Sequence, residues 1–337
     1  MDPPVTRPRL KDIAARTGYS VATVQRAIGA PHLLAEETRQ RIVKTMEELG
    51  YVPDRNAAGL VTNSSGFVAL VVSSMTSSTF ADTIQGVADA TREVGREILL
   101  VQTDYNPKRE YDVIRAVLGR RPDGLILTFS PLERRTRLML KQAGTPVVEV
   151  WDLPKRAIDM VAGISNTEAG AQMATYLAAK GYRSPVFFGQ LIGRDTARWE
   201  AFSSEFHKLT GETPVQVSVG SGASVLEEAF DQGDALLDRL AALGKAVDSV
   251  FCASDITAAG VVFAAVRRGV RIPEDLAVCG FGDLRFSAAM APRLTTVHVP
   301  SYEMGRAAAD LIQARLTGKR ASGRLKLTTY VISRETA

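Results

Sequence analysis

The residues of this chain that could do chemistry fall into two groups, and both groups favour binding over catalysis. The first occupies residues 20–26, where side chains could bond to base edges and phosphates. The second is a set of polar and aromatic residues that closely follow apolar runs. Its members are Ser74, Ser78, Thr79, Phe80, Asp104, Thr128, Trp151, Asp152, Asn166, Arg198, Asp255 and Asp283. The sequence has no GxxxxGK(S/T) phosphate loop, no HExxH and no GxSxG, so we expect no catalytic residues and no cofactor.

The first group lies in Leu10–Gly29, LKDIAARTGYSVATVQRAIG, which has a helix-turn-helix pattern. One apolar helix face ends at a turn glycine, and Ser20 is an N-cap candidate for a second helix. In such a unit the second helix lies in the major groove of DNA. The candidate contacts are Val21, Ala22, Gln25 and Arg26 to bases, and Ser20 and Thr23 to phosphates. Helical hairpins without a DNA role are also common, so the pattern alone leaves both readings open.

A third helix is expected from about Glu36 to Leu49, with Gly50 as its C-cap. Its predicted core face consists of Ile42, Val43, Met46 and Leu49. Residues 51–63 then form a linker with weak helical tendency.

From residue 66 onward, apolar runs alternate with amphipathic segments. Predicted strands FVALVVSS, EILLVQT, DGLILTF and PVVEVW come with helices from about residues 79, 107 and 132. A second series, SPVFFG, PVQVSVG, SVFCA and LAVCGF, comes with helices near 195–210, 223–243 and 256–269. A helix from Ser301 and one last strand near LKLTTYVISR follow. This rhythm predicts two lobes with doubly wound parallel sheets and a cleft between them, and the second group of residues lies where such sheets bind ligands.

Composition limits the class of protein. A chain of 337 residues with 45% apolar residues and a net charge of +4 is globular, and the charge permits DNA binding without indicating it. Cys252 and Cys279 lie in apolar runs and are expected to be inert core thiols. Three histidines argue against a histidine-rich metal site. With no run of about 20 apolar residues and no signal-peptide core in MDPPVTRPR, we expect a cytoplasmic location and no membrane partner.

The chain resembles the lac repressor (LacI) family of bacterial transcription regulators. The resemblance is carried by LKDIA, SVATVQRAI and EETRQRIVKTMEELGYVP, and by SNTEAG (165–170), ASDITAAG (253–260), GFGDL (280–284) and LTTV (294–297). It implies an all-α helix-turn-helix domain (1–50), a hinge segment (51–63) and a two-lobed α/β domain like that of periplasmic binding proteins (64–337). Lobe 1 is expected at about 64–163 plus 299–319, and lobe 2 at about 164–297 plus 321–335.

The resemblance also assigns roles near DNA. The hinge segment becomes a helix in the minor groove, with Leu60 wedged between base steps and Arg55 and Ala57 as further contacts. Gly59 is unusual for the family and should leave this helix less stable by about 1 kcal/mol relative to alanine. Gly29, Gln25 and Ala35 also depart from the family pattern, and Ala35 replaces a capping serine.

Arg198 and Asp255 match the positions that commonly hold the effector in this family. Both residues have another possible role: Arg198 could form an ion pair with Asp195 or Glu200, and Asp255 could cap the following helix. Trp151 could likewise belong to the hydrophobic core and not to the binding site. Among family members the chain looks most like the gluconate-utilisation repressors, which implies a sugar-acid effector held by the planar fork of Arg198. Neutral sugars remain an alternative, and purines are less favoured.

The absence of a leucine-heptad tail, which tetrameric relatives carry, points to a homodimer on a palindromic operator. Two other classes were weighed. A periplasmic sugar-binding protein would need a signal peptide and would have no use for residues 10–62, and a sugar-processing enzyme would need a catalytic motif.

Overall fold

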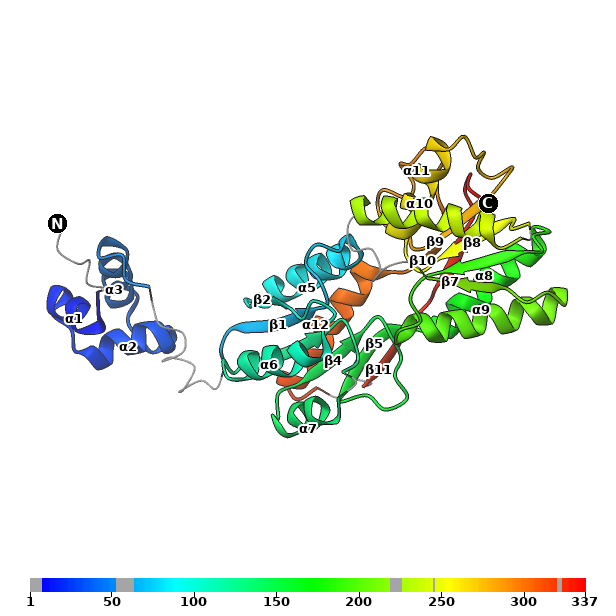
Figure 1. The fold of residues 1–337 in the computed structure, drawn as a ribbon. Helices are drawn as coiled ribbons and strands as arrows, with labels where there is room; N and C mark the ends of the chain where they lie inside the picture. Colours follow the sequence, from blue (N-terminus) through cyan, green and yellow to red (C-terminus); the bar gives the residue numbers. More distant parts are fainter. Residues whose placement is uncertain (1–7, 53–63, 132, 219–225, 245, 320–322) are drawn as a thin grey trace. The chain divides into compact units, whose positions relative to one another are not determined.

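The computed structural model describes residues 8–52, 64–131, 133–218, 226–244, 246–319 and 323–337. The chain divides into two compact units, residues 1–66 and 67–337, and each is described by itself (Figure 1). Within the described residues, no helix is long and apolar enough to cross a membrane.

The first unit is a small bundle of helices around Ile13, Val24, Ala27 and Ile42. The Ser20 hydroxyl accepts a hydrogen bond from the Thr23 backbone N–H at 3.1 Å, which confirms the N-cap. The expected core position of Val43 is wrong: this side chain is 37% exposed and lies outside the cluster, because it is one residue off the buried face. The elements are α1 (Leu10–Thr17), α2 (Val21–Gly29), η1 (Pro31–Leu33) and α3 (Glu36–Glu48).

The second unit contains two sheets, and the first of them forms lobe 1. Its strand order is β11-β5-β4-β3-β1-β2, and every pairing is parallel. Alternate residues of β1 face opposite sides: Val68 and Leu70 belong to one cluster with α5 and α12, while Ala69 and Val71 belong to another with α6 and α7. The elements are β1 (Phe67–Val72), η2 (Ser78–Phe80), α5 (Ala81–Glu93), β2 (Glu97–Gln102), α6 (Pro107–Leu118), β3 (Gly124–Leu127), α7 (Arg134–Gln142), β4 (Val147–Val150), β5 (Met160–Ile164), α12 (Ser301–Leu316) and β11 (Arg324–Leu327).

Lobe 2 repeats this plan with strand order β12-β10-β9-β8-β6-β7. Phe187 faces a cluster with α8 and α9, and its neighbours Val186 and Phe188 face a cluster with α10 and α11. Cys252 and Cys279 are both buried and unpaired by disulfide, and burial raises the pKa of both thiols. The elements are α8 (Asn166–Ala179), β6 (Pro185–Phe188), α9 (Arg194–Thr210), β7 (Val215–Val217), α10 (Leu226–Ala242), β8 (Ser249–Cys252), α11 (Asp255–Arg267), β9 (Ala277–Gly282), β10 (Thr295–His298) and β12 (Tyr330–Ile332).

Three strand assignments differ from the sequence expectation. β5 and β10 were not expected as strands. The single last strand is instead two strands in different sheets: β11 pairs with β5 of lobe 1, and β12 pairs antiparallel with β10 of lobe 2. The placement of 321–335 wholly in lobe 2 is therefore wrong, because the chain passes from one sheet to the other at Thr328 and Thr329.

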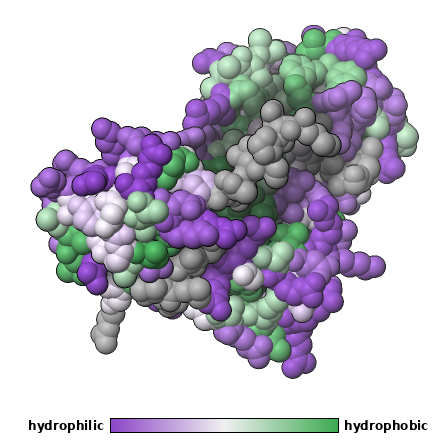
Figure 2. Space-filling model, turned by 90° about the vertical axis from the view of Figure 1, so that its left-hand side faces the viewer, coloured by the Kyte–Doolittle hydropathy of each residue, from purple (hydrophilic) through white to green (hydrophobic). Residues whose placement is uncertain are grey.

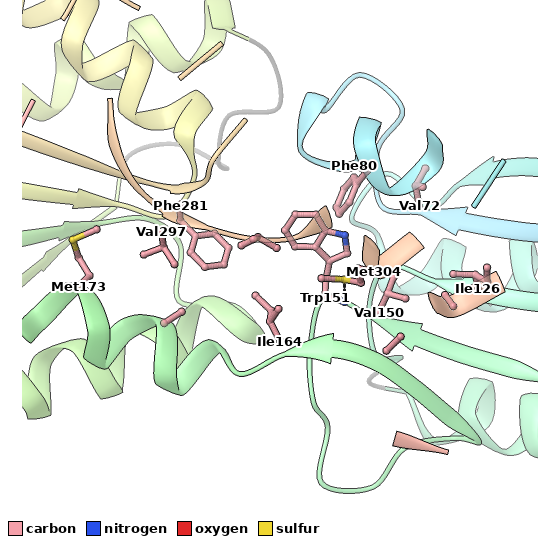
Figure 3. Close-up of a cluster of buried hydrophobic side chains, with 14 of the residues drawn as sticks. Val72, Phe80, Ile126, Val150, Trp151, Ile164, Met173, Phe281, Val297 and Met304 are labelled. Atoms are coloured by element: carbon pink, nitrogen blue, oxygen red, sulfur yellow. Dashed lines mark hydrogen bonds between the residues drawn. The ribbon is translucent and has the colours of Figure 1, made fainter. Parts of the chain in front are cut away.

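The chain passes between the lobes at three places: after β5, after β10 and after β11. One apolar cluster continues through this region, and Figure 3 shows Phe281 and Val297 of lobe 2 on one side and Phe80, Trp151 and Met304 of lobe 1 on the other. Ile164, at the end of β5, lies between them (Figure 3).

Glycines let paired helices approach backbone to backbone. A Cβ atom on Gly86 of α5 would overlap the carbonyl oxygen of Tyr302 in α12, and one on Gly170 of α8 would overlap that of Arg198 in α9. Gly260 of α11 has the same relation to Ala229 of α10. These three helix pairs cannot accept a larger side chain at the contact without moving apart.

Candidate functional site

The proposed base-reading side chains lie on the exposed side of α2. Val21 is 41% exposed, and Ala22, Gln25 and Arg26 are also exposed. Within the described residues, neither the Gln25 amide nor the Arg26 guanidinium has a hydrogen-bonding partner, so both remain available to bases. The Ser20 and Thr23 hydroxyls lie 2.9 Å apart at the N-terminus of α2, which suits a phosphate. Arg55, Ala57, Gly59 and Leu60 lie outside the described residues.

The second candidate site gathers at the carboxyl ends of the parallel strands, around a buried arginine. The Arg198 side chain is 1% exposed. Its Nη1 donates to Oδ1 of Asn166 at 2.9 Å, and its Nη2 donates to the Ala253 carbonyl at 3.0 Å and to the Asp195 carboxylate. The guanidinium carbon lies 3.7 Å from the centre of the Phe281 ring. Burial lowers the pKa of Arg198, and Asp195 opposes this shift.

Asn166 extends this contact toward lobe 1. Its Nδ2 donates to the Trp151 carbonyl at 3.1 Å and approaches Oδ1 of Asp152 at 3.3 Å. Asp152 follows β4, Asn166 follows β5, and Arg198 lies in the helix that follows β6. We call Asp152, Asn166, Asp195 and Arg198 the strand-end network. Sequence analysis named three of these residues as ligand contacts and named Asp195 only as an alternative partner of Arg198.

Arg198 also has one nitrogen without a partner. Its Nε is buried and makes no hydrogen bond to any described residue. Thr128 follows β3 in lobe 1, and its hydroxyl is also buried and makes no hydrogen bond to any described residue. Buried polar groups are nearly always bonded in folded proteins, so these two groups are candidates to bond a polar ligand.

Sequence reasoning missed Arg194, the first residue of α9. Its Nη1 donates to the Thr128 carbonyl at 3.0 Å, so it links lobe 2 to lobe 1. Its guanidinium lies 5.5 Å from the centre of the Trp151 ring and 5.7 Å from that of Phe80. The pattern carried no signal for this contact, because an arginine in the first turn of a helix usually reads as a surface cation.

Phe80 and Trp151 are buried wall residues of this site. Their rings meet edge to face at 5.6 Å, and the Trp151 Nε1 donates to the Thr83 hydroxyl at 3.1 Å. Trp151 is 1% exposed, in agreement with the alternative that it belongs to the core. Of the expected lobe 1 contacts, Ser74 is buried and bonds to Thr76 at 2.9 Å, Ser78 and Thr79 lie at η2, and Asp104 pairs with Arg109 on the surface.

Asp255 has hydrogen-bonding partners within lobe 2. This carboxylate is 0% exposed, and its oxygens accept hydrogen bonds from the Leu284 N–H at 2.7 Å, from the Ser287 hydroxyl at 2.7 Å and from the Thr296 hydroxyl at 2.5 Å. Burial raises its pKa to about 6, against the effect of these donors. Asp255 therefore holds the ends of β9 and β10 together, and each of its carboxylate oxygens already accepts a hydrogen bond from the protein.

Asp283 is likewise occupied within lobe 2. Its carboxylate accepts from Arg334 at 2.6 Å and contacts the His298 ring at 2.8 Å. Burial alone would raise the pKa of Asp283, but these two partners outweigh it and hold the pKa below its ordinary value. The other polar groups at the strand ends are those of the strand-end network, Arg194, Thr128 and Ser74.

An open surface hollow lies away from the strand ends. It has a volume of about 620 Å³ and is an open groove lined by residues of α8, α9 and β12, including Gln172, Tyr176 and Tyr330. It contains none of the residues at the carboxyl ends of the strands, where parallel sheets of this type bind their ligands. The strand ends are instead filled by Arg194 and the aromatic rings beside it.

Comparisons with known proteins match both parts of the chain. Residues 9–54 match the model of bacterial regulatory proteins, lacI family, and residues 174–337 match a periplasmic binding protein-like domain. The HTH-type transcriptional regulator GntR of Pseudomonas aeruginosa is 34% identical over 93% of this chain and 90% of its own. A LacI family transcriptional regulator from Silicibacter pomeroyi has a TM-score of 0.88 at 28% identity, covering 98% of this chain and 99% of that one. The transcriptional regulator CelR, solved with cellobiose, has a TM-score of 0.67 at 27% identity, covering 98% and 100%.

Proposed function

The chain belongs to the lacI family of bacterial regulatory proteins and is a DNA-binding transcription regulator, and we propose that it is a repressor controlled by a sugar acid. In this proposal a homodimer binds a palindromic operator, and the acid binds between the lobes. The observation that carries the effector class is the presence of two guanidinium groups, Arg194 and Arg198, at the carboxyl ends of the strands.

A carboxylate is the ligand that this pair of arginines fits. The Arg198 Nε is a buried donor without a partner, and Arg194 donates to a neutral backbone carbonyl. A charged carboxylate oxygen accepts a stronger hydrogen bond than a neutral carbonyl does, so it would displace the Arg194–Thr128 contact. The remaining hydroxyls of a sugar acid would meet the Thr128 and Ser74 hydroxyls of lobe 1. Arg194 thereby joins Arg198 as a proposed carboxylate contact.

Ligand binding is transmitted through the relative position of the lobes. Arg194 belongs to lobe 2 and its present partner to lobe 1, so exchange of this contact for a ligand contact changes what holds the lobes together. Affinities for effector and operator are then coupled reciprocally, typically by about 1 to 3 kcal/mol. On the DNA side, Gln25 and Arg26 read the major groove, and Leu60, in the segment outside the described residues, is the proposed wedge in the minor groove.

The dimer contact is proposed on the outer face of lobe 2. Phe263 and Val266 of α11 are 41% and 57% exposed and lie on the same side of the helix. Figure 2 shows hydrophobic surface at the top of the molecule, where Figure 1 places α10 and α11. Exposed apolar patches of this kind mark association surfaces.

The test of the effector class compares two ligands that differ only in the carboxylate. Gluconate should raise the melting temperature of the purified protein by mass action, while glucitol, which carries CH2OH in its place, should not. Arg194→Gln should reduce the gluconate shift, whereas the control Arg183→Gln, on the surface of lobe 2, should retain it. A shift with cellobiose or glucitol alone would overturn the sugar-acid assignment.

The test of operator binding is selection of duplexes from a random pool by the full chain. We expect a palindromic site, and Leu60→Ala should weaken binding to it far more than binding to unrelated DNA. Equal losses on both kinds of DNA would contradict the wedge, and recovery of no preferred sequence would contradict the regulator proposal.

A further inference from the structure

Four unpaired cations lie along one edge of the lobe 1 sheet. Arg120 and Arg121 occupy the turn between α6 and β3, Lys141 lies in the last turn of α7 before β4, and Lys319 follows α12 before β11. All four are exposed, and none has a side-chain hydrogen bond or ion pair with a described residue. We call these four residues the basic edge.

The parallel pairing places them together. Val68 pairs with Gly124, Leu125 with Val147, and Val161 with Arg324, so β1, β3, β4, β5 and β11 begin at nearly the same level. The loops that precede these strands therefore share one edge of the sheet. A groove of about 290 Å³ at this edge is lined by Lys141, Gly144, Asp159 and Arg315 among others.

Other charges at this edge are already neutralised. Arg96 pairs with Asp123 at 2.9 Å, and Arg315 pairs with Asp159 at 2.9 Å. Arg92 pairs with Asp89 at 3.2 Å. Glu97 is the one exposed carboxylate here without a partner in the described part of the chain, so the free charge of the edge is positive.

The corresponding edge of lobe 2 carries arginines that are neutralised as well as cations that are not. There Arg268 pairs with both Asp234 and Asp238, Arg271 pairs with Asp275, and Arg293 pairs with Glu335. Arg268, Arg271 and Arg293 are therefore neutralised, whereas Lys180 and Arg183 at the same edge have no carboxylate partner among the described residues. Arg121 is also unusual in its backbone, because its φ of 53° lies in the left-handed region that favours glycine. An arginine occupies a position where glycine would fit with less strain.

The basic edge is also the edge at which the DNA-binding unit is attached, because β1 begins there at Phe67. The chain between Val52 and Ser64 can span at most about 40 Å even when fully extended. Any DNA held by α2 is therefore at high effective concentration near the basic edge.

We propose that the basic edge of lobe 1 binds the phosphate backbone of DNA flanking the operator. The inference rests on the proposed operator binding and adds a second, sequence-independent contact to it. Arginine and lysine side chains without protein partners supply this kind of contact, which positions a protein on DNA and carries no base specificity.

The test uses the full chain and two duplexes: the selected operator alone, and the same operator extended by about ten base pairs, one helical turn, on each side. Wild-type protein should bind the extended duplex more tightly and with a steeper salt dependence, by about 0.9 in the log–log slope for each phosphate contact. The double variant Arg120→Gln/Arg121→Gln should lose this difference and retain binding to the short operator, which shows that it is folded.

The control variant Lys180→Gln/Arg183→Gln removes the same charge from the matching edge of lobe 2 and should keep the difference. Equal wild-type affinities for the two duplexes would overturn the inference, as would an equal loss in both double variants. Failure of wild-type protein to bind the short operator is a separate result that contradicts the proposed function itself.

Discussion

Arg198 donates from Nη1 to Oδ1 of Asn166 at 2.9 Å, and this bond joins α9 to the first residue of α8, directly after a passage between the lobes. Asn166 in turn donates to the Trp151 carbonyl at 3.1 Å in lobe 1. A residue proposed to bind the effector is thus fixed to the segment about which the lobes would move.

Asn166→Ala should destabilise the protein by about 1–3 kcal/mol, because it leaves a buried guanidinium N–H and the Trp151 carbonyl without partners. Urea unfolding measures this change in free energy. Gln85→Ala, on the exposed side of α5, is the control and should change little. A loss in Asn166→Ala no larger than in the control would show that the bond contributes nothing to stability.

Asp255→Ala should cost at least about 2 kcal/mol of stability, since it leaves the Leu284 N–H and the Ser287 and Thr296 hydroxyls unpaired. The folded variant should still respond to the effector, because the carboxylate already serves three donors within lobe 2. Urea unfolding and the thermal shift with gluconate measure the two effects. Unchanged stability together with a lost ligand shift would return Asp255 to the binding site.

Glu110→Gln should change how stability depends on pH. Glu110 of α6 is 8% exposed, one of its oxygens has no partner among the described residues, and burial, with Glu133 nearby, raises its pKa from 4.5 to about 7. Because the folded state holds this proton more tightly, wild-type unfolding free energy should fall as pH rises from 4.5 to 7, by roughly 3 kcal/mol at most.

The Glu110→Gln variant should lack this fall and be the more stable protein at pH 8. Unfolding by urea across the pH range is the measurement, with Glu97→Gln as a surface control. Parallel pH profiles for wild type and Glu110→Gln would contradict the assignment.

The two helix starts of the DNA-binding unit form a matched pair. Ser20 caps α2 through the Thr23 N–H, whereas Ala35 gives α3 no side-chain cap. Ser20→Ala should therefore destabilise this unit by about 1 kcal/mol, and Ala35→Ser should stabilise it by a similar amount. The exchange rates of the α3 backbone amides in the full chain measure both changes, since these amides exchange faster when the unit is less stable and more slowly when it is more stable. Changes in the same direction would show that capping does not decide the stability of this unit.

Much of the fold can be predicted from local patterns, because apolar runs such as those around Leu70 and Phe251 make buried strands by themselves. The separation of β11 from β12 cannot, since LKLTTYVIS is one continuous strand-like run, and Thr328 and Thr329 do not mark a change of sheet. The sequence also did not predict β5 as a strand, because its five residues, MVAGI, form only a short apolar run between polar segments.

The position of the candidate site could be predicted from the sequence, but not all of the residues that form it. Strand ends identified Asn166 and Arg198, because topology alone brings those residues together. The occupation of Asp255 could not be seen, since its hydroxyl donors lie 32 and 41 residues away along the chain. Arg194 was missed for the opposite reason: its aromatic neighbours come from the other lobe, and no local pattern records them.

The glycine contacts in the helix pairs have a mechanical consequence. Because Gly86, Gly170 and Gly260 seat backbone against backbone, α5 cannot slide over α12, nor α8 over α9, nor α11 over α10, without steric overlap. Each lobe is therefore expected to move as a rigid body along these helix pairs. A change in the relation of the lobes is therefore expected to fall on the three short connections between them, after β5, β10 and β11.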